Sequence, residues 1–242
     1  YGDTNSTVAA ALSAVKMHLP VAHLEAGLRS FNRRMPEEHN RVMTDHAADL
    51  LLAPTEVAVA HLANEGLADR TVLVGDVMTD VLFDVRDQLA GRDSPLVAEL
   101  GLTPGDHYVA TIHRAENTDD PARLAEVAGA LSGLGRPVVL LAHPRVVAKA
   151  AAHGISLTQG SLIAHAPLAY ADLIAAALQS AGIVTDSGGL QKEAYLLRVP
   201  CTTVRTETEW VETVELGWNV LATTAEEIAA GVTRPRAAET GA

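Results

Sequence analysis

The chain has 242 residues, of which 48% are hydrophobic and 20% are charged, enough to bury the core of one large α/β domain or of two smaller ones. Its formal net charge of −12 argues against non-specific binding to nucleic acid. Because the single cysteine, Cys201, cannot form an internal disulfide and no apolar run reaches transmembrane length, we expect a cytoplasmic protein that binds neither nucleic acid nor membrane.

Apolar runs alternate with helix-like stretches along the first part of the chain. Pro20 ends the first helix, Pro36 stands at the start of the second, where proline is favoured, and Thr55 caps the third. Helices are expected over residues 7–17, from 37 or 38 to 48, over 55–65 and from about 79, and strands over 21–24, 50–53 and 72–74.

A linker-like stretch over residues 90–104, with Gly, Asp, Ser and Pro, leads into a second series of elements. Strands are expected over residues 108–112, 137–142, 161–164, 182–185 and 199–204, and helices over 120–134, 170–180 and 190–197. Strands that alternate with helices are typical of parallel sheets covered on both faces. The sequence therefore predicts an α/β fold. It also predicts a loose tail over residues 233–242.

A polar or charged side chain follows each of several expected strands. These residues are Asp3, Glu25, His113, His143, Ser187 and Arg205. In open parallel sheets, ligands bind at the carboxyl ends of the strands. Their shared placement predicts a functional site better than any one of them does.

The stretch TDSGGLQKEA, residues 185–194, predicts an anion site. A strand ends, Gly188 and Gly189 allow close approach of the backbone, and a helix begins whose free N–H groups face an anion. Ser187 adds a hydroxyl, and Glu193 lies where it could reach sugar hydroxyls. The stretch is neither a Walker motif nor GxGxxG, and a plain strand-to-helix turn is an equally good interpretation.

Two further strands are followed by a histidine and an arginine. His113 and Arg114 lie in TIHRAEN, and His143 and Arg145 lie in AHPR. Histidine can exchange a proton near neutral pH, and arginine holds phosphate or carboxylate groups. A lone histidine here is more often structural. The histidines show no metal-ligand spacing, so we expect no metal, and Cys201 is expected to be a core residue.

The stretch HLEAGLRSFNRRMPEEHNR, residues 23–41, gathers three glutamates, two histidines and four arginines. A solvated charged loop would explain this composition, and so would a site of proton transfer.

Together, the ordered motifs GDTNST, HLEAGLRS, PEEHNR, APTE, VGDVMTD, TIHRAEN, HPR, TDSGGLQKEA and ETEWVETVELGWNVL resemble those of the non-hydrolysing UDP-N-acetylglucosamine 2-epimerases. The resemblance extends to about Leu221. It implies two Rossmann-like domains with parallel sheets that face each other across a cleft, the glycosyltransferase-B architecture. It implies interconversion of UDP-N-acetylglucosamine and UDP-N-acetylmannosamine without a metal, nicotinamide or other cofactor, as part of polysaccharide biosynthesis.

The resemblance also implies roles for particular residues. In this family UDP is eliminated across C1–C2 of the sugar to give 2-acetamidoglucal, and UDP is then added back. Asp3, Glu25 and Glu37 match the acidic catalytic positions, and His113 matches the catalytic histidine. The substrate-binding positions are Arg114, Ser187, Gly188, Gly189, Glu193 and Arg205, with residues 165–173 near uracil. His143 and Arg145 could border a regulatory site, because some members are activated by their own substrate.

The sequence departs from the family pattern in two places. The Gly-Thr-Arg-Pro-Glu loop and the strand before Asp3 are absent, so we expect the first domain to be truncated. Trp210 stands where some members have an arginine, which leaves Arg205 as the cation. We expect residues 1–70 to be the remainder of the N-terminal domain, 71–222 the UDP-binding C-terminal domain, and 223–242 a helix and tail.

Three other functions stay open at this point. One is a hydrolysing epimerase that releases UDP and N-acetylmannosamine, and another is an inactive sugar-nucleotide-binding fragment. The third is a glycosyltransferase of the same architecture, which the acids of the first domain disfavour. For the epimerase we expect a UDP-sugar as substrate and a homodimer as the assembly.

Overall fold

The computed structural model describes residues 1–235, and the chain divides into two compact units, Tyr1–Val81 and Leu82–Ala242. The division falls within α4 (Val77–Gln88). We had expected it between residues 70 and 71. Residues 71–73 instead form a strand of the first sheet, so the division lies later than the sequence pattern suggested. Of the expected C-terminal helix and loose tail, residues 236–242 lie outside the described residues.

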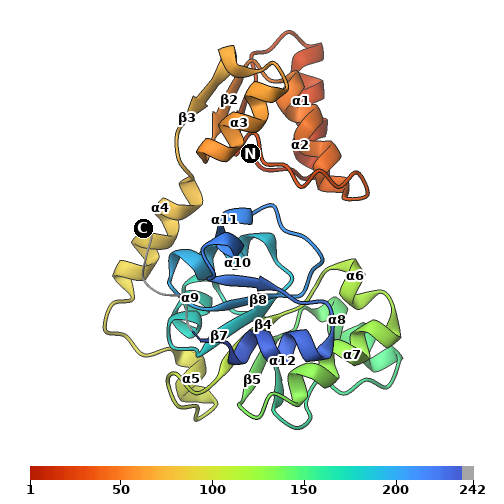
Figure 1. The fold of residues 1–242 in the computed structure, drawn as a ribbon, viewed down its shortest axis with the longest axis vertical. Coiled ribbons are helices and arrows are strands. Elements are labelled where there is room, and N and C mark those ends of the chain that lie inside the picture. The colour runs from red at the N-terminus through yellow and green to blue at the C-terminus, as the bar shows by residue number, and fades with distance from the viewer. Residues whose placement is uncertain (236–242) are drawn as a thin grey trace. The chain divides into compact units, whose positions relative to one another are not determined.

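The first unit is built on a small parallel sheet of three strands in the order β1-β2-β3 (Figure 1). The strands are β1 (Ala22–Leu24), β2 (Leu50–Ala53) and β3 (Thr71–Leu73). The helices are α1 (Asn5–Lys16), α2 (Pro36–Ala47), α3 (Glu56–Asn64) and the 3-10 turn η1 (Ala68–Arg70). Pro36 is the first residue of α2, and the Thr55 side chain caps α3 by accepting from the Ala58 N–H.

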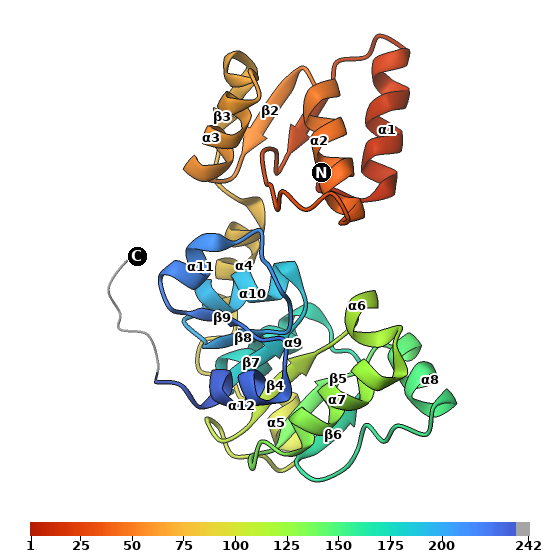
Figure 2. The same cartoon turned by 45° about the vertical axis from the view of Figure 1, so that its right-hand side comes forward.

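Two different surfaces cover this sheet. The helix α3 packs an apolar stripe, Ala58 and Leu62, against Leu51 and Ala53 of β2. The helix α2 lies beside α1, as Figures 1 and 2 both show, and its buried residues are polar. They are Glu38, Asn40, Arg41, Thr44 and Asp45. Because buried polar and charged groups need partners, this face of α2 must be matched by polar groups of other segments.

The second unit contains a parallel sheet of six strands in the order β6-β5-β4-β7-β8-β9. The strands are β4 (Tyr108–Thr111), β5 (Val138–Leu141), β6 (Leu162–His165), β7 (Gly182–Thr185), β8 (Cys201–Thr203) and β9 (Asn219–Leu221). The helices that follow α4 are α5 (Pro95–Glu99), α6 (Ala115–Thr118), α7 (Pro121–Ser132), α8 (Pro144–Ala152), α9 (Tyr170–Leu178), α10 (Gly188–Leu196), α11 (Val211–Glu215) and α12 (Ala225–Thr233).

Successive strand residues of this unit point to opposite faces of the sheet, as a pleated strand requires. Tyr108 and Ala110 pack with α7, α8 and α12, whereas Val109 packs with α5 and α9. A third cluster joins α4, α9 and α10 over Ile183. Helices therefore cover both faces, and together with the parallel sheet of the first unit this confirms the expected α/β class.

The order of the second sheet creates one topological switch point. From β4 the chain moves outward through β5 and β6, and it then returns to the opposite side of β4 as β7. The connections after β4 and β7 leave the sheet in opposite directions, so their carboxyl ends flank a crevice where ligands bind in folds of this kind.

Gly27 is a position that only glycine can occupy, because it combines a φ of +86° with a close backbone neighbour. A Cβ there would lie 2.5 Å from the Ala58 carbonyl oxygen. At Gly66 the φ is +76° and no atom lies within 4 Å of such a Cβ.

We expect Gly66→Ala to lower the free energy of unfolding by about 1–2 kcal/mol because of the left-handed backbone. Gly27→Ala should lower it by about 1–3 kcal/mol more because of overpacking. Urea unfolding followed by circular dichroism measures both losses, and equal losses would contradict this account of Gly27.

Candidate active site

A cavity of about 570 Å³ lies at the switch point of the second unit. Its lining comes from the segments that follow β4, β5 and β7 and from the start of α9. The residues expected from the sequence that line it are His113, His143, Arg145, Ser187, Gly189 and Glu193. The loop expected near uracil also contributes, through Pro167, Leu168, Tyr170 and Leu173. The structure thus brings most of the sequence-predicted residues of this unit together.

The N-terminus of α10 opens at this cavity. Ser187 is its N-cap, with the side-chain oxygen accepting from the Leu190 N–H at 3.3 Å. The Ser187 N–H is itself donated to the Thr185 hydroxyl at 2.9 Å, which fixes the turn between β7 and the helix. Backbone N–H groups and the positive end of the helix dipole favour an anion at such a terminus.

Arg205 lies beside this helix terminus but is already paired. Its Nη1 donates to Glu209 Oε2 at 2.9 Å, and both side chains are almost completely buried. A Cβ on Gly188 would overlap the Glu209 carboxylate, so a larger residue there would have to displace that side chain. Within the described part of the chain, the buried Nη2 of Arg205 has no hydrogen-bond partner. Arg205 Nη2 is therefore an unpaired buried donor close to the start of α10.

Asp186 organises the end of β7, and the sequence analysis did not single it out. Its fully buried carboxylate accepts from the backbone N–H groups of His113 and Arg114, from the Asn117 amide, and from His113 Nδ1 at 3.0 Å. Burial alone would raise the pKa of Asp186, but the hydrogen bonds from His113, Arg114 and Asn117 outweigh it and lower the pKa below its usual value. His113 lines the cavity, and its Nδ1 is held by Asp186.

Arg114 contributes to this arrangement mainly through its backbone. Its N–H donates to Asp186, and it stands as the N-cap residue of α6. Its side chain is not part of the cavity lining, and neither are Gly188 and Arg205.

Glu193 faces the cavity from α10 and is held by Tyr170, whose hydroxyl donates to Glu193 Oε1 at 2.8 Å. Burial raises the pKa of Glu193, while the bond from Tyr170 and the charge of Lys192 work in the opposite direction without cancelling it. Burial also raises the pKa of Tyr170. The pair provides a positioned acceptor beside an apolar wall, which suits the hydroxyls of a ribose.

The structure places the possible regulatory residues on this same cavity. The His143 side chain caps α8 by accepting from the Arg145 N–H at 3.2 Å, and both residues line the cavity with Ser187 and Glu193. The Arg145 guanidinium reaches Asp119 at 3.2 Å, next to Lys149.

Asp3, the first of the acids of the other unit, is held from two sides by α2. Arg41 Nη2 donates to Asp3 Oδ2 at 2.7 Å, and Asn40 Nδ2 donates to the Asp3 backbone carbonyl at 2.9 Å. Arg41 is nearly buried, whereas the Asp3 side chain keeps 33% of its surface exposed. The carboxylate is thus fixed in direction while one side of it stays accessible.

Glu25 occupies the turn after β1 with an unusual backbone. Its φ is +73°, a left-handed value that is rare for residues other than glycine, and its N–H donates to Leu52 O at 3.1 Å. Its Oε2 would lie 3.6 Å from a Cβ placed on Gly2. The turn therefore directs the Glu25 carboxylate toward the segment that carries Asp3.

The two glutamates at the start of α2 differ in their environment. Glu38 is buried and accepts from the backbone N–H groups of Ser30 and Phe31, from the Ser30 hydroxyl and from Arg41. Glu37 is only half-buried in the first turn of the helix, where the dipole favours a carboxylate. The hydrogen bonds of Glu38 hold the loop before α2, and Glu37 accepts none of these hydrogen bonds.

Within residues 1–235, no group of three His, Cys, Asp or Glu side chains could hold a metal ion, and none of the helices has the length and apolar character of a membrane span. Cys201 is fully buried, and burial raises the pKa of its thiol to about 12, which confirms its assignment as a core residue.

Comparison with known proteins gives one consistent result. Residues 1–240 match a family model described as UDP-N-acetylglucosamine 2-epimerase. A UDP-N-acetylglucosamine 2-epimerase homolog of Methanococcus maripaludis is 43% identical over 91% of this chain, and the UDP-2,3-diacetamido-2,3-dideoxy-D-glucuronate 2-epimerase of Pseudomonas aeruginosa is 47% identical over 94%. The chain spans 63% and 64% of the lengths of these two relatives.

A solved structure agrees with the sequence relatives. The UDP-GlcNAc 2-epimerase of Methanocaldococcus jannaschii, crystallised in complex with UDP-GlcNAc and UDP, is 34% identical. It superimposes with a TM-score of 0.88 and covers 97% of this chain and 68% of its own.

Asp186 should contribute to stability in a pH-dependent way. Because its pKa is lowered in the folded state, its contribution is present above the ordinary aspartate pKa, about 3.9, and is lost as the pH falls through the folded-state value. We expect Asp186→Asn to cost about 1–3 kcal/mol at pH 7, and the difference from wild type to shrink in acid. Urea unfolding across pH measures this, with the exposed Asp93→Asn as the carboxylate control. A difference that stays constant with pH would contradict the account.

Proposed function

The chain belongs to the UDP-N-acetylglucosamine 2-epimerase family, and on that premise we propose that the whole protein interconverts UDP-N-acetylglucosamine and UDP-N-acetylmannosamine. The observation that carries the proposal is the way the motif acids are held. Asp3 is fixed by the buried Arg41 yet partly exposed, and Glu25 is fixed by its turn. Acids oriented in this way suit proton transfer better than a solvated charged loop would.

The chemistry needs such acids because C2 of the sugar is not next to a carbonyl group. In the proposed reaction a carboxylate removes the C2 proton while the bond between C1 and the UDP oxygen breaks, giving 2-acetamidoglucal and UDP. In the return step UDP oxygen bonds to C1, and a carboxylic acid delivers a proton to the other face of C2. Two of the three acids Asp3, Glu25 and Glu37 serve as this acid–base pair.

The second unit would hold the nucleotide. The Gly188 and Gly189 N–H groups at the start of α10 and the Ser187 hydroxyl suit the diphosphate, with Arg205 Nη2 beside them. Glu193 suits the ribose hydroxyls, and the segment with Pro167 and Leu168 offers an apolar wall for the uracil ring. Protonated on Nε2, with Nδ1 held by Asp186, His113 would stabilise the negative charge of the departing diphosphate.

Product analysis tests this function and separates it from its alternatives. The whole protein is incubated with UDP-N-acetylglucosamine and followed by phosphorus and proton NMR. The proposal expects UDP-N-acetylmannosamine with its diphosphate linkage intact. Free UDP together with N-acetylmannosamine would identify a hydrolysing epimerase. Binding of UDP without either product would identify an inactive binding protein.

A second substrate is favoured by one comparison. The Pseudomonas aeruginosa relative, named for UDP-2,3-diacetamido-2,3-dideoxy-D-glucuronate, shares 47% identity with this chain. The same elimination and re-addition at C2 would epimerise that sugar, which differs at C3 and C6. The ratio of kcat/KM for the two UDP-sugars, measured on one preparation, decides between them. The expected homodimer, cytoplasmic location and regulatory role of His143 and Arg145 stay predictions.

Glu37 should matter for turnover and not for nucleotide affinity. Glu37→Gln keeps the size of the side chain but removes the carboxylate, so we expect kcat to fall by roughly 100-fold or more while the Kd for UDP changes little. Stopped assays and calorimetry measure the two quantities. The control is Glu56→Gln, an exposed glutamate in the first turn of α3. Normal turnover in Glu37→Gln would remove this residue from the catalytic set.

A further inference from the structure

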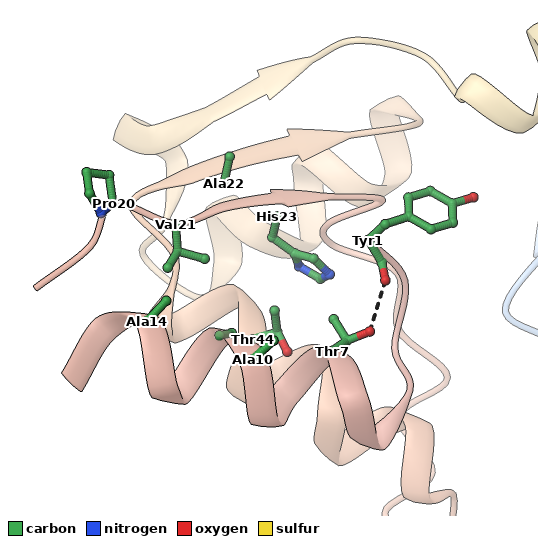
Figure 3. Close-up of a pocket in the computed structure, with 10 residues that line it drawn as sticks. Tyr1, Thr7, Ala10, Ala14, Pro20, Val21, Ala22, His23 and Thr44 are labelled. Atoms are coloured by element: carbon green, nitrogen blue, oxygen red, sulfur yellow. Dashed lines mark hydrogen bonds between the residues drawn. The ribbon is translucent and has the colours of Figure 1, made fainter. Parts of the chain in front are cut away.

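His23 lies in the first unit and has no part in the mechanism above. It stands in the middle of β1 and is only 1% exposed. Figure 3 shows its ring pointing from β1 into the space beside α1, near Thr7, Thr44 and Tyr1, where these residues line a pocket of about 310 Å³. A buried histidine of this kind must satisfy both ring nitrogens within the protein.

Both nitrogens of His23 meet oxygens that can only accept. Nδ1 lies 2.6 Å from Asp45 Oδ1, and Nε2 lies 2.8 Å from the backbone carbonyl oxygen of Gly2. A neutral imidazole has one donor and one acceptor, so it could make only one of these hydrogen bonds. The ring makes both when it carries a proton on each nitrogen, and the buried Asp45 carboxylate, which also pairs with Arg29, lies directly against the resulting charge.

The charged groups around His23 are few. Asp45 of α2 faces it directly and is shared with Arg29, whose Nη1 lies 2.8 Å from Asp45 Oδ2. From α1 the side chain of Thr7 is neutral, and its hydroxyl donates to the Tyr1 carbonyl. Glu25 Oε2 lies near Gly2, 3.6 Å from a Cβ placed on that residue.

The contacts that run from Asp45 through the His23 ring to the Gly2 carbonyl form a bridge. The other hydrogen bonds of Asp45 extend this bridge to both ends of the Glu25 turn. Besides His23, it accepts from the Gly27 N–H at 3.1 Å and from Arg29. His23 and Gly27 lie on either side of Glu25, and Gly2 precedes Asp3. A single pair, His23 and Asp45, therefore connects the backbone segment of one candidate catalytic acid to the turn of another.

We propose that His23 is a doubly protonated positioning residue that ties the Gly2–Asp3 segment to the Glu25 turn through Asp45. The proposal rests on the proposed function, because it assigns the bridge to the placement of Asp3 and Glu25. It does not require His23 to touch the substrate.

Two substitutions separate the halves of the bridge. The amide nitrogen of His23→Gln can replace Nε2 at the Gly2 carbonyl, and that of His23→Asn can replace Nδ1 at Asp45, but neither replaces both. We expect each to lower kcat by roughly 10- to 100-fold, since small misplacements of catalytic groups have effects of this order. The KM for the UDP-sugar and the Kd for UDP should change less than threefold or so. His18→Gln, at an exposed position of the same unit, is the matched control.

Nitrogen-15 NMR of the histidine rings in the wild-type protein reads the protonation state independently of activity. We expect the His23 signal, assigned through bonds from the backbone resonances of His23 in the wild-type protein, to show two protonated nitrogens at neutral pH. One bare nitrogen would overturn the proposal, and this measurement holds even if a variant fails to fold. Wild-type kcat in both variants would overturn the positioning role. Absence of turnover in the wild type would instead count against the proposed function.

Discussion

The carboxylate of Asp45 is fully buried, and the first unit depends on how that charge is compensated. A buried carboxylate without partners is costly, and removing one partner of a buried ion pair typically destabilises by about 3–5 kcal/mol. Asp45 is matched by His23, Arg29 and the Gly27 N–H. Because these groups lie on β1 and on the turn that follows it, satisfying one charge on α2 also fixes the path of that turn.

Other buried polar residues of α2 are also matched by partners in neighbouring segments. Arg41 pairs with Asp3 and Glu38, and Asn40 bonds the backbone of Asp3. An apolar helix face would tolerate small shifts of its neighbours, whereas hydrogen bonds to charged groups are directional. A polar helix face against a small sheet is thus a way to hold strand-end carboxylates at fixed positions.

The second unit contains a smaller version of this arrangement. Asp186 at the end of β7 gathers the backbone of His113 and Arg114 from the end of β4. In both units a fully buried aspartate bonds to the backbone of a segment at the end of a strand, Gly27 after β1 and His113 after β4. The candidate catalytic and binding groups, Glu25 in one case and His113 in the other, are carried by these segments.

The sequence predicted the fold class and the gathering of several candidate residues at one cavity because both follow from local pattern. Apolar runs and proline positions located most strands and helices, and side chains after strands such as His113 and Ser187 do line one cavity. The strand β9 and the helices α5, α6 and α11 were missed, since segments of three to five residues carry little periodicity. The nine-residue helix α8 was missed as well. The partners of Asp45, Asp186 and Tyr170 were missed because these contacts join residues up to 73 positions apart, and no spacing rule reports them.

The most direct measurement of the central claim is exchange of the C2 hydrogen. The whole protein is incubated with UDP-N-acetylglucosamine in deuterated water, and deuterium at C2 is followed by NMR and mass spectrometry. If acids of the first unit remove and return this proton, both epimers of the UDP-sugar acquire deuterium at C2 with the diphosphate intact. Formation of UDP-N-acetylmannosamine that retains hydrogen at C2, or bound substrate that never exchanges, would contradict the account.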